Sequence, residues 1–403
     1  MVQRAGTGSE RCGGHWINQL LKYVSTAEDM ELGVVTAFPG LKEMEFREDG
    51  IDYFVLSQPR RYPLFGMRPE DLEKCCAVVE HYKPDVIHIH GSERFYGLIK
   101  KRACVQTPTL VSVQGLLGPY SSSRQDFFGA LSLRQIFSSI RLLEVPARSG
   151  LFWQYIDTLR GASREAEILT AVEGFLGRTA WDRAHTQIAN PGARYFHVGE
   201  ILRDSFYQHR WRLEDCERHT LLYTNAGHPR RGIENLLAAV AHLRHEFPDI
   251  RLRLAGVVRP RSGYGRFMRR TIRRLGLEEQ VEFLGHLDEQ AMIRELKRAH
   301  VFTIASYIEN SPNSLAEAMT LGMPCVASFV GGIPDMVRDN ETGLLFPVSD
   351  VPLLADKIRR VFADDGLAER LGSNARAVAI ERHDPARVKG ELLDAYQRFS
   401  VGE

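Results

Sequence analysis

Two glutamates eight positions apart, Glu309 and Glu317, flank a stretch whose residue types suit the binding of an anion. Between them, Ser311 and Pro312 form a pair typical of a helix start, since Ser can accept from free amides as the N-cap and Pro needs no partner. The backbone N–H groups of residues 311–315 would then face outward at the positive helix end, which favours a phosphate. A carboxylate on each side of this cradle suits the ribose, diphosphate and hexose of a nucleotide-sugar.

The neighbouring segments predict how these residues are held. An apolar run at residues 301–305 is typical of a buried strand that ends shortly before Glu309. The helix that carries Glu317 should end at Gly322 and Pro324, and residues 325–329 are typical of the next buried strand. Glu309 is therefore expected in a loop between strand and helix, and Glu317 inside the helix.

Length and composition narrow the possible classes. The 403 residues, 44% of them hydrophobic, indicate two or three globular domains. A net charge of +1 argues against a dedicated nucleic-acid binder. The six scattered cysteines form no C-x-x-C pair, so neither a zinc knuckle nor a disulfide framework is indicated, and a reducing cytoplasm fits best. The polar start of the chain does not resemble a signal peptide, and no run of about twenty apolar residues predicts a membrane span.

Strand and helix patterns alternate along most of the chain. Apolar runs end in polar or glycine tips at residues 86–91 and 109–114, and each is followed by a helical pattern. Such βαβ repetition predicts an α/β fold with mostly parallel sheets, in which ligands lie at the carboxyl ends of the strands. A charged, aromatic-rich segment at residues 204–218 is the expected hinge between two halves.

Two segments, residues 119–161 and 259–274, each allow two interpretations. Residues 119–161 break the rhythm with many apolar side chains, and we expect one or two extra helices on the first domain. These helices would serve either as added core packing or as an apolar acceptor groove or membrane-facing patch. Residues 259–274 hold seven arginines and no acid, which fits either a solvated basic helix or attraction to an anionic membrane surface or acidic acceptor.

The opening motif extends into a longer signature. Glu-x7-Glu is followed by GxPxVAS, a Gly-Gly-x-Pro-Asp turn and ETGLLFP. This combination resembles the donor site of retaining glycosyltransferases of the GT-B fold, family 4. The resemblance covers nearly the whole chain and is strongest over residues 281–350. It implies two Rossmann-like domains with mostly parallel sheets facing a cleft: an N-terminal acceptor-binding domain (1–208), a C-terminal nucleotide-sugar donor-binding domain (209–382), and a helix crossing back to the first domain (383–403).

The resemblance also implies roles for individual residues. Glu317 should bind the ribose hydroxyls, and Glu309 should lie beside the donor sugar. Backbone groups near these glutamates and at two other turns complete the implied donor site: Ser311, Asn313, Ser314 and Leu315 for a phosphate, Gly285, His286 and Leu287 for the base, and Gly13 and Gly14 for the diphosphate.

The sequence departs from the family at two places. A segment of the form GRLxxxKG usually supplies an Arg and a Lys to the diphosphate; here TNAGHPRRG places Arg231 at the Lys position and Ala226 at the Arg position. Arg231 can stabilise a leaving diphosphate, Arg230 is an alternative, and Arg178 could replace the missing charge.

The second departure concerns the sugar side of the cleft. Gln114 stands at a strand end where the family often has a His, and Gln can hydrogen-bond a hydroxyl but cannot take a proton. His90 ends the neighbouring strand and joins Glu309 and Arg231 in the predicted catalytic set. Gln114, Arg178 and Glu200 are the candidates for the acceptor or sugar side.

The implied reaction is transfer of a sugar from a nucleotide-sugar, with a UDP-sugar favoured, to the hydroxyl of a sugar or a lipid-linked sugar. The resemblance implies retention of anomeric configuration, no metal and no further cofactor, because arginines and amides can neutralise the leaving diphosphate. The expected setting is polysaccharide or glycolipid assembly in the cytoplasm, at the inner face of the membrane if the basic and apolar segments bind lipid. Two alternatives stay open: a nucleotide-sugar epimerase of the same fold, and a non-catalytic nucleotide-sugar-binding subunit.

Overall fold

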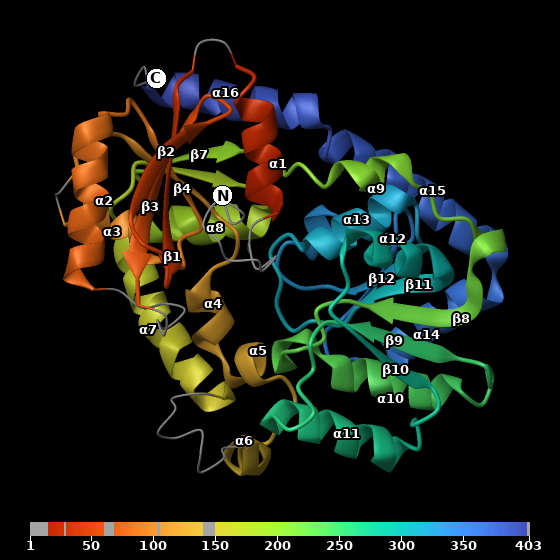
Figure 1. Cartoon of the computed structure of the whole chain (residues 1–403). Coiled ribbons are helices and arrows are strands. Elements are labelled where there is room, and N and C mark those ends of the chain that lie inside the picture. The colour runs from red at the N-terminus through yellow and green to blue at the C-terminus, as the bar shows by residue number, and fades with distance from the viewer. Residues whose placement is uncertain (1–14, 28–29, 60–67, 103–104, 140–149, 401–403) are drawn as a thin grey trace.

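The protein consists of two α/β domains joined by a linker, as shown by a computed structural model that describes residues 15–27, 30–59, 68–102, 105–139 and 150–400 (Figure 1). Gly13 and Gly14, the predicted diphosphate-binding pair, lie outside the described residues.

The strands of the first domain form two sheets. One has the order β1-β3-β2, with β1 and β3 parallel, and the other is fully parallel with the order β4-β5-β6-β7. The strands are β1 (Leu32–Pro39), β2 (Met44–Glu48), β3 (Ile51–Gln58), β4 (Ile87–His90), β5 (Thr109–Ser112), β6 (Gly174–Gly177) and β7 (Arg194–His197). The helices are α1 (His15–Val24), α2 (Pro69–Tyr82), α3 (Leu98–Lys101), α4 (Leu117–Ser122), α5 (Arg124–Phe128), α6 (Leu133–Ser139), α7 (Leu151–Leu169) and α8 (Ala180–Ala189).

A single parallel sheet organises the second domain, with the order β10-β9-β8-β11-β12-β13. Helices cover both of its faces (Figure 1), so a central strand such as β11 is buried along its whole length and reads as a continuous apolar run. The strands are β8 (Glu217–Tyr223), β9 (Arg251–Ala255), β10 (Val281–Gly285), β11 (Ala299–Ile304), β12 (Cys325–Ser328) and β13 (Leu344–Phe346). The helices are α10 (Ile233–Leu243), α11 (Gly263–Leu275), α12 (Glu289–Arg298), α13 (Asn313–Leu321), α14 (Val351–Ala363) and α15 (Asp365–Arg382).

The chain passes between the two domains twice near the interdomain linker. The chain leaves β7 and enters the second domain through α9 (Asp204–Gln208), within the charged segment expected as the hinge. It returns in α16 (Pro385–Ser400), which packs on the first domain, where Val388, Leu392 and Phe399 share a buried cluster with strand residues of that domain. The carboxyl ends of the second-domain strands point toward the first domain (Figure 1).

A third crossing is formed by an interdomain arm, which comprises α5, the loop after it and α6 (residues 124–139). Phe127, Phe128, Leu131 and Ile136 belong to the buried core cluster of the second domain. The backbone N–H of Ala130 donates to Oε1 of the buried Glu234 on α10 at 2.9 Å. The extra helices expected on the first domain are therefore found there only in part: α4 and α7 pack against each other in that domain. The arm between them buries its apolar side chains in the second domain instead.

None of the described helices combines the length and apolar character needed to cross a bilayer.

Candidate active site

Glu309 lies in the loop between β11 and α13, as the strand and helix patterns predicted, and its side chain is buried. Oε1 of Glu309 accepts a hydrogen bond from Oγ of Ser306 at 2.8 Å and forms an ion pair with the Arg231 guanidinium. This carboxylate is therefore fixed in place by one hydroxyl and one cation, both from the second domain.

The Gly331-Gly332 turn packs directly against this loop and explains its two glycines. Gly331 has a φ of +51°, and a Cβ there would overlap the carbonyl oxygen of Glu309. The N–H of Gly332 donates to that same oxygen at 3.1 Å. The turn thus sets the backbone of Glu309, and only glycine leaves room for it.

Arg231 lies in a short 3₁₀ helix, Pro229–Arg231, that rests on the loop before Glu309. The N–H of Tyr307 donates to the carbonyl of Arg230 at 2.9 Å, and the Tyr223 hydroxyl donates to the carbonyl of Arg231 at 2.8 Å. Burial, helped by neighbouring Arg230, lowers the pKa of Arg231 to about 10, so the guanidinium remains charged at neutral pH. Arg230 stacks on the ring of Tyr120 from the first domain, 5.1 Å from the ring centroid.

Glu317 lies inside α13 and is 8% exposed. Its Oε1 accepts two hydrogen bonds from Arg203, at 3.0 Å from Nε and 2.7 Å from Nη2. Burial raises the pKa of Glu317 to about 7, although the Arg203 charge opposes the rise. Arg203 belongs to the interdomain linker, so the hinge region holds the carboxylate expected at the ribose.

The predicted base site is open. Gly285 ends the edge strand β10 with a φ of +69°, and no atom of the described residues beyond its chain neighbours lies within 4 Å of where its Cβ would be. His286 is exposed and Leu287 is half-buried. Arg203 also approaches Glu289, the first residue of α12, with 3.8 Å between Nη1 and Oε2. The same arginine therefore contacts Glu317 and the helix that follows the predicted base site.

The start of α13 differs by one residue from the prediction. Pro312, in extended conformation, is the N-cap, and the Ser311 hydroxyl packs against Sδ of Met336 at 3.7 Å instead of capping the helix. The amides of Asn313 and Ser314 have no acceptor within the helix because they belong to its first turn. The amide of Leu315 donates to the Pro312 carbonyl at 3.0 Å, so it is already engaged.

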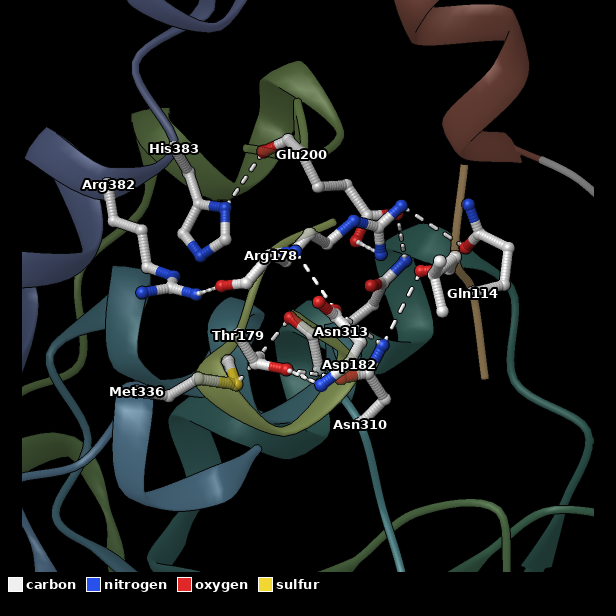
Figure 2. Close-up of polar contacts among 12 residues, drawn as sticks. Gln114, Arg178, Thr179, Asp182, Glu200, Asn310, Asn313, Met336, Arg382 and His383 are labelled. Carbon is white, nitrogen blue, oxygen red and sulfur yellow. Dashed lines mark hydrogen bonds and ion pairs between the residues drawn. The ribbon is translucent and has the colours of Figure 1, made fainter. Parts of the chain in front are cut away.

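Gln114, Arg178 and Glu200 come together as one hydrogen-bonded chain that reaches the second domain (Figure 2). Arg178 donates from Nη2 to Oε1 of Gln114 at 3.2 Å and from Nη1 to Oε2 of Glu200 at 2.6 Å. Asn313, on the first turn of α13, donates to Oε1 of Glu200 at 2.9 Å. The three predicted sugar-side residues therefore lie at the edge of the candidate phosphate site.

Next to this hydrogen-bonded chain, a second group of polar contacts joins the two domains (Figure 2). Oδ1 of Asn310 accepts from the Thr179 hydroxyl at 2.7 Å, and its Nδ2 donates to Oδ2 of Asp182 at 3.1 Å. All three side chains are buried. Arg382 continues the contact by donating to the carbonyls of Arg178 at 2.7 Å and Asp335 at 3.0 Å.

His90 ends β4 and is half-buried. Its ring is tilted by 38° against that of His88, with 3.9 Å between the ring centroids, and desolvation of the ring together with the Arg178 charge lowers the pKa of His90 to about 4. At neutral pH the ring is uncharged, so it can offer a hydrogen bond to a sugar but cannot act as a strong acid.

Four residues that join the two domains were not found from the sequence. Arg203, Thr179, Asn310 and Arg382 connect segments far apart in the chain, and no local pattern links them.

Two further positions near the site, Glu93 and Ala226, can be recognised from their place in the sequence. Glu93 could have been noticed, since it follows the strand that ends at His90: its carboxylate lies across Gly91, and burial raises its pKa. Ala226, at the position where the resemblance expects Arg, is fully buried.

Known proteins resemble this chain in sequence. Residues 208–378 match the family model described as "Glycosyl transferases group 1". A D-inositol 3-phosphate glycosyltransferase of Streptomyces bingchenggensis is 33% identical over 186 residues, which is 45% of this chain and 41% of that protein. The matched stretch thus spans less than half of that relative. An alpha-D-kanosaminyltransferase of Streptomyces kanamyceticus is 24% identical over 70% of this chain and 74% of its own.

Solved structures share the fold at low sequence identity. Sucrose-phosphate synthase from Thermosynechococcus elongatus has a TM-score of 0.75 and 21% identity, over 96% of this chain and 93% of that chain. The Anabaena protein HepE, solved with UDP and glucose, has a TM-score of 0.61 and 18% identity over 87% of both chains. These likenesses confirm the predicted GT-B architecture of two Rossmann-like domains.

Proposed function

We propose that this chain, whose residues 208–378 match the model of the group 1 glycosyl transferases, acts as an enzyme of that family. It transfers a sugar from a nucleoside diphosphate sugar to an acceptor hydroxyl with retention of anomeric configuration. The observation that carries the proposal is the arrangement around the start of α13. Glu309, paired with Arg231, precedes the first-turn amides in the chain, and Glu317 follows them further along the helix. This order matches sugar, phosphates and ribose along a nucleotide-sugar.

In the proposed step, the bond between the anomeric carbon and the diphosphate oxygen breaks while the acceptor oxygen attacks the same face. The acceptor's proton passes to the departing phosphate oxygen, so no protein base is required. Arg231 and Arg230, together with the amides of Asn313 and Ser314, stabilise the charge that develops on the diphosphate. Glu309 lies beside the sugar ring and holds Arg231 toward the phosphates.

The closed arrangement of the domains supports a single-displacement reaction of this kind. Asn310 and Asn313, at the edge of the candidate phosphate site, both bond directly to first-domain side chains. Donor binding at α13 is thereby coupled to domain closure, which brings acceptor and donor together and excludes water.

For the donor, UDP-sugars are the first to test, since the Anabaena relative in fold was solved with UDP and glucose. For the acceptor we propose a sugar or lipid-linked sugar on the cytoplasmic side, in glycoconjugate assembly. We also infer metal independence, because Arg230, Arg231 and the α13 amides offer the positive charge that a metal would otherwise supply.

The test is a two-stage assay. Thermal-shift screening of UDP, GDP, ADP and their sugars identifies the nucleotide, because a ligand that binds only the folded protein raises its melting temperature. Transfer from the selected donor to a panel of hydroxyl acceptors is then followed by NMR of the anomeric proton. Product with the donor's anomeric configuration supports the proposal; inverted product contradicts the retaining step, and an epimerised donor formed without any acceptor indicates an epimerase.

One observation favours a second candidate, a nucleotide-sugar-binding subunit without activity. Ala226 is fully buried where the resemblance expects an arginine. The Arg231 and Arg230 pair would then be too weak for turnover. Tight binding of UDP with no transfer across the donor and acceptor panel would favour this candidate over the enzyme.

A further inference from the structure

The helix α6 exposes two large apolar side chains on one side. Leu133 and Phe137 are 59% and 63% exposed and stand four residues apart, which places them on the same face of a helix. Ile136, on the same helix, is buried in the second-domain core. Ile136 therefore anchors the helix to the second domain, while Leu133 and Phe137 remain exposed.

The neighbouring helix α11 adds a strongly basic face. The two helices contact each other and lie at the end of the molecule opposite α16 (Figure 1). Tyr264, Met268 and Ile272 form the buried side of α11. Its outer side carries four exposed arginines: Arg269, Arg270, Arg273 and Arg274.

These four arginines differ from Arg253 and Arg298 of the same domain, which lie among carboxylates. Within the described part of the chain, none of the four forms an ion pair with a carboxylate. Arg253 and Arg298, by contrast, are neutralised by Glu217, Glu282 and Glu295. With seven arginines and no acid over residues 259–274, the positive charge of α11 is local, since the whole chain carries a net charge of only +1.

We propose that α6 and the outer side of α11 form a docking surface for an anionic lipid bilayer. Leu133 and Phe137 enter the boundary between headgroups and acyl chains, and the arginines of α11 bind the lipid phosphates. Exposed apolar side chains on α6, together with unpaired cations on the helix that contacts it, match a membrane surface better than nucleic acid, whose phosphates offer no apolar layer. The proposal is independent of the donor and the acceptor.

The test is vesicle flotation of the purified full chain. Vesicles of pure phosphatidylcholine are compared with vesicles in which roughly a third of the lipid is phosphatidylglycerol. We expect binding only to the anionic vesicles, and weaker binding as salt is raised. Equal binding to both vesicle types, or none to either, would overturn the proposal.

Matched variants separate the two parts of the surface. Arg270→Gln with Arg274→Gln should weaken vesicle binding by about tenfold or more, whereas Arg359→Gln with Arg370→Gln, an equal loss of charge at exposed positions of α14 and α15, should not. Phe137→Ser with Leu133→Ser should weaken it similarly, whereas Ile188→Ser, at an 82% exposed position on α8, should not.

The melting temperature and transfer to a soluble acceptor are measured for every variant, and DNA binding is measured for the two surface pairs. All of these side chains are exposed, so the melting temperature and transfer to a soluble acceptor should stay as in the wild type, and failure of the lipid proposal is then separate from failure of the catalytic one. If the Arg pair weakens binding to a DNA duplex as strongly as binding to vesicles, while the Phe137 and Leu133 pair affects neither, the surface binds polyanions and the membrane proposal is wrong.

Discussion

Replacing Arg203 with Met should shift the pH dependence of donor binding toward higher pH. Burial raises the pKa of Glu317 from 4.5 to about 7 while Arg203, bonded at 2.7 and 3.0 Å, opposes the rise. Without this cation the pKa should rise further. The carboxyl would then be protonated at neutral pH and would lose its charge-assisted hydrogen bonds to the ribose hydroxyls.

The size of the effect follows from the same interactions. Charge-assisted hydrogen bonds are worth about 1.5–3 kcal/mol, so the donor Kd of Arg203→Met at pH 7 should rise roughly 10- to 100-fold. In the wild type, donor affinity should increase as the pH rises through about 7, the pKa of Glu317, and level off above it. Arg203→Lys keeps the charge and should keep most of this profile.

Stability without donor should follow the opposite trend. A carboxyl whose pKa is raised from 4.5 to about 7 favours the folded state most below its unfolded pKa, and this contribution is lost as the pH rises through about 7. The shift corresponds to about 3 kcal/mol. Glu317→Gln should remove both the pH dependence of binding from this group and the loss of stability.

The assay is isothermal titration with a UDP-sugar between pH 5.5 and 8.5. A UDP-sugar is preferable to UDP because its diphosphate is esterified at both ends and does not titrate in this range. Glu165 is the control, since burial raises the pKa of its carboxyl to about 7 as well; Glu165→Gln should leave the binding profile in place. The reasoning is refuted if wild-type affinity does not depend on pH, or if Arg203→Met keeps the wild-type midpoint.

Three further predictions address the rest of the site. Glu309→Ala and Arg231→Ala should each abolish transfer while the melting temperature shows a folded protein; near-normal turnover in either would remove that residue from the proposed step. Gly331→Ala should destabilise the protein by about 3 kcal/mol or more, because its Cβ would meet the Glu309 carbonyl; an unchanged denaturant midpoint would contradict this, and Gly50→Ala, with open space around its Cβ, is the control. Transfer should survive treatment with EDTA, and loss of activity that Mg²⁺ restores would show that the arginines are insufficient.

The local parts of the fold and site were predictable from the sequence. Glu309 after a buried strand, Glu317 within a helix and the Gly331-Gly332 turn all follow from patterns a few residues long, and the structure has each of them. The sequence predicted Ser311 as the N-cap of α13, one residue too early, because the Ser-Pro pair is typical of a helix start but does not show which of its two residues is the cap. Pro312 is the N-cap, and Ser311 packs inward.

The contacts that join distant segments were not predictable. Arg203 and Glu317 are 114 positions apart, and Thr179 and Asn310 are 131 apart. Charged and polar residues occur throughout the surface of such a chain, so pairing them requires the fold itself. The interdomain arm was misassigned for the same reason: an apolar helix pattern shows that a face is buried but not which domain buries it.

The interdomain arm also bears on how the molecule unfolds. Phe127, Phe128, Leu131 and Ile136 fill the second-domain core, while the chain on either side of them belongs to the first domain. Melting either domain alone would open this cluster and expose it to water. Calorimetry should therefore record a single heat-absorption peak, with a calorimetric enthalpy that matches the van't Hoff value for the whole chain, and a protease should find no stable half to release.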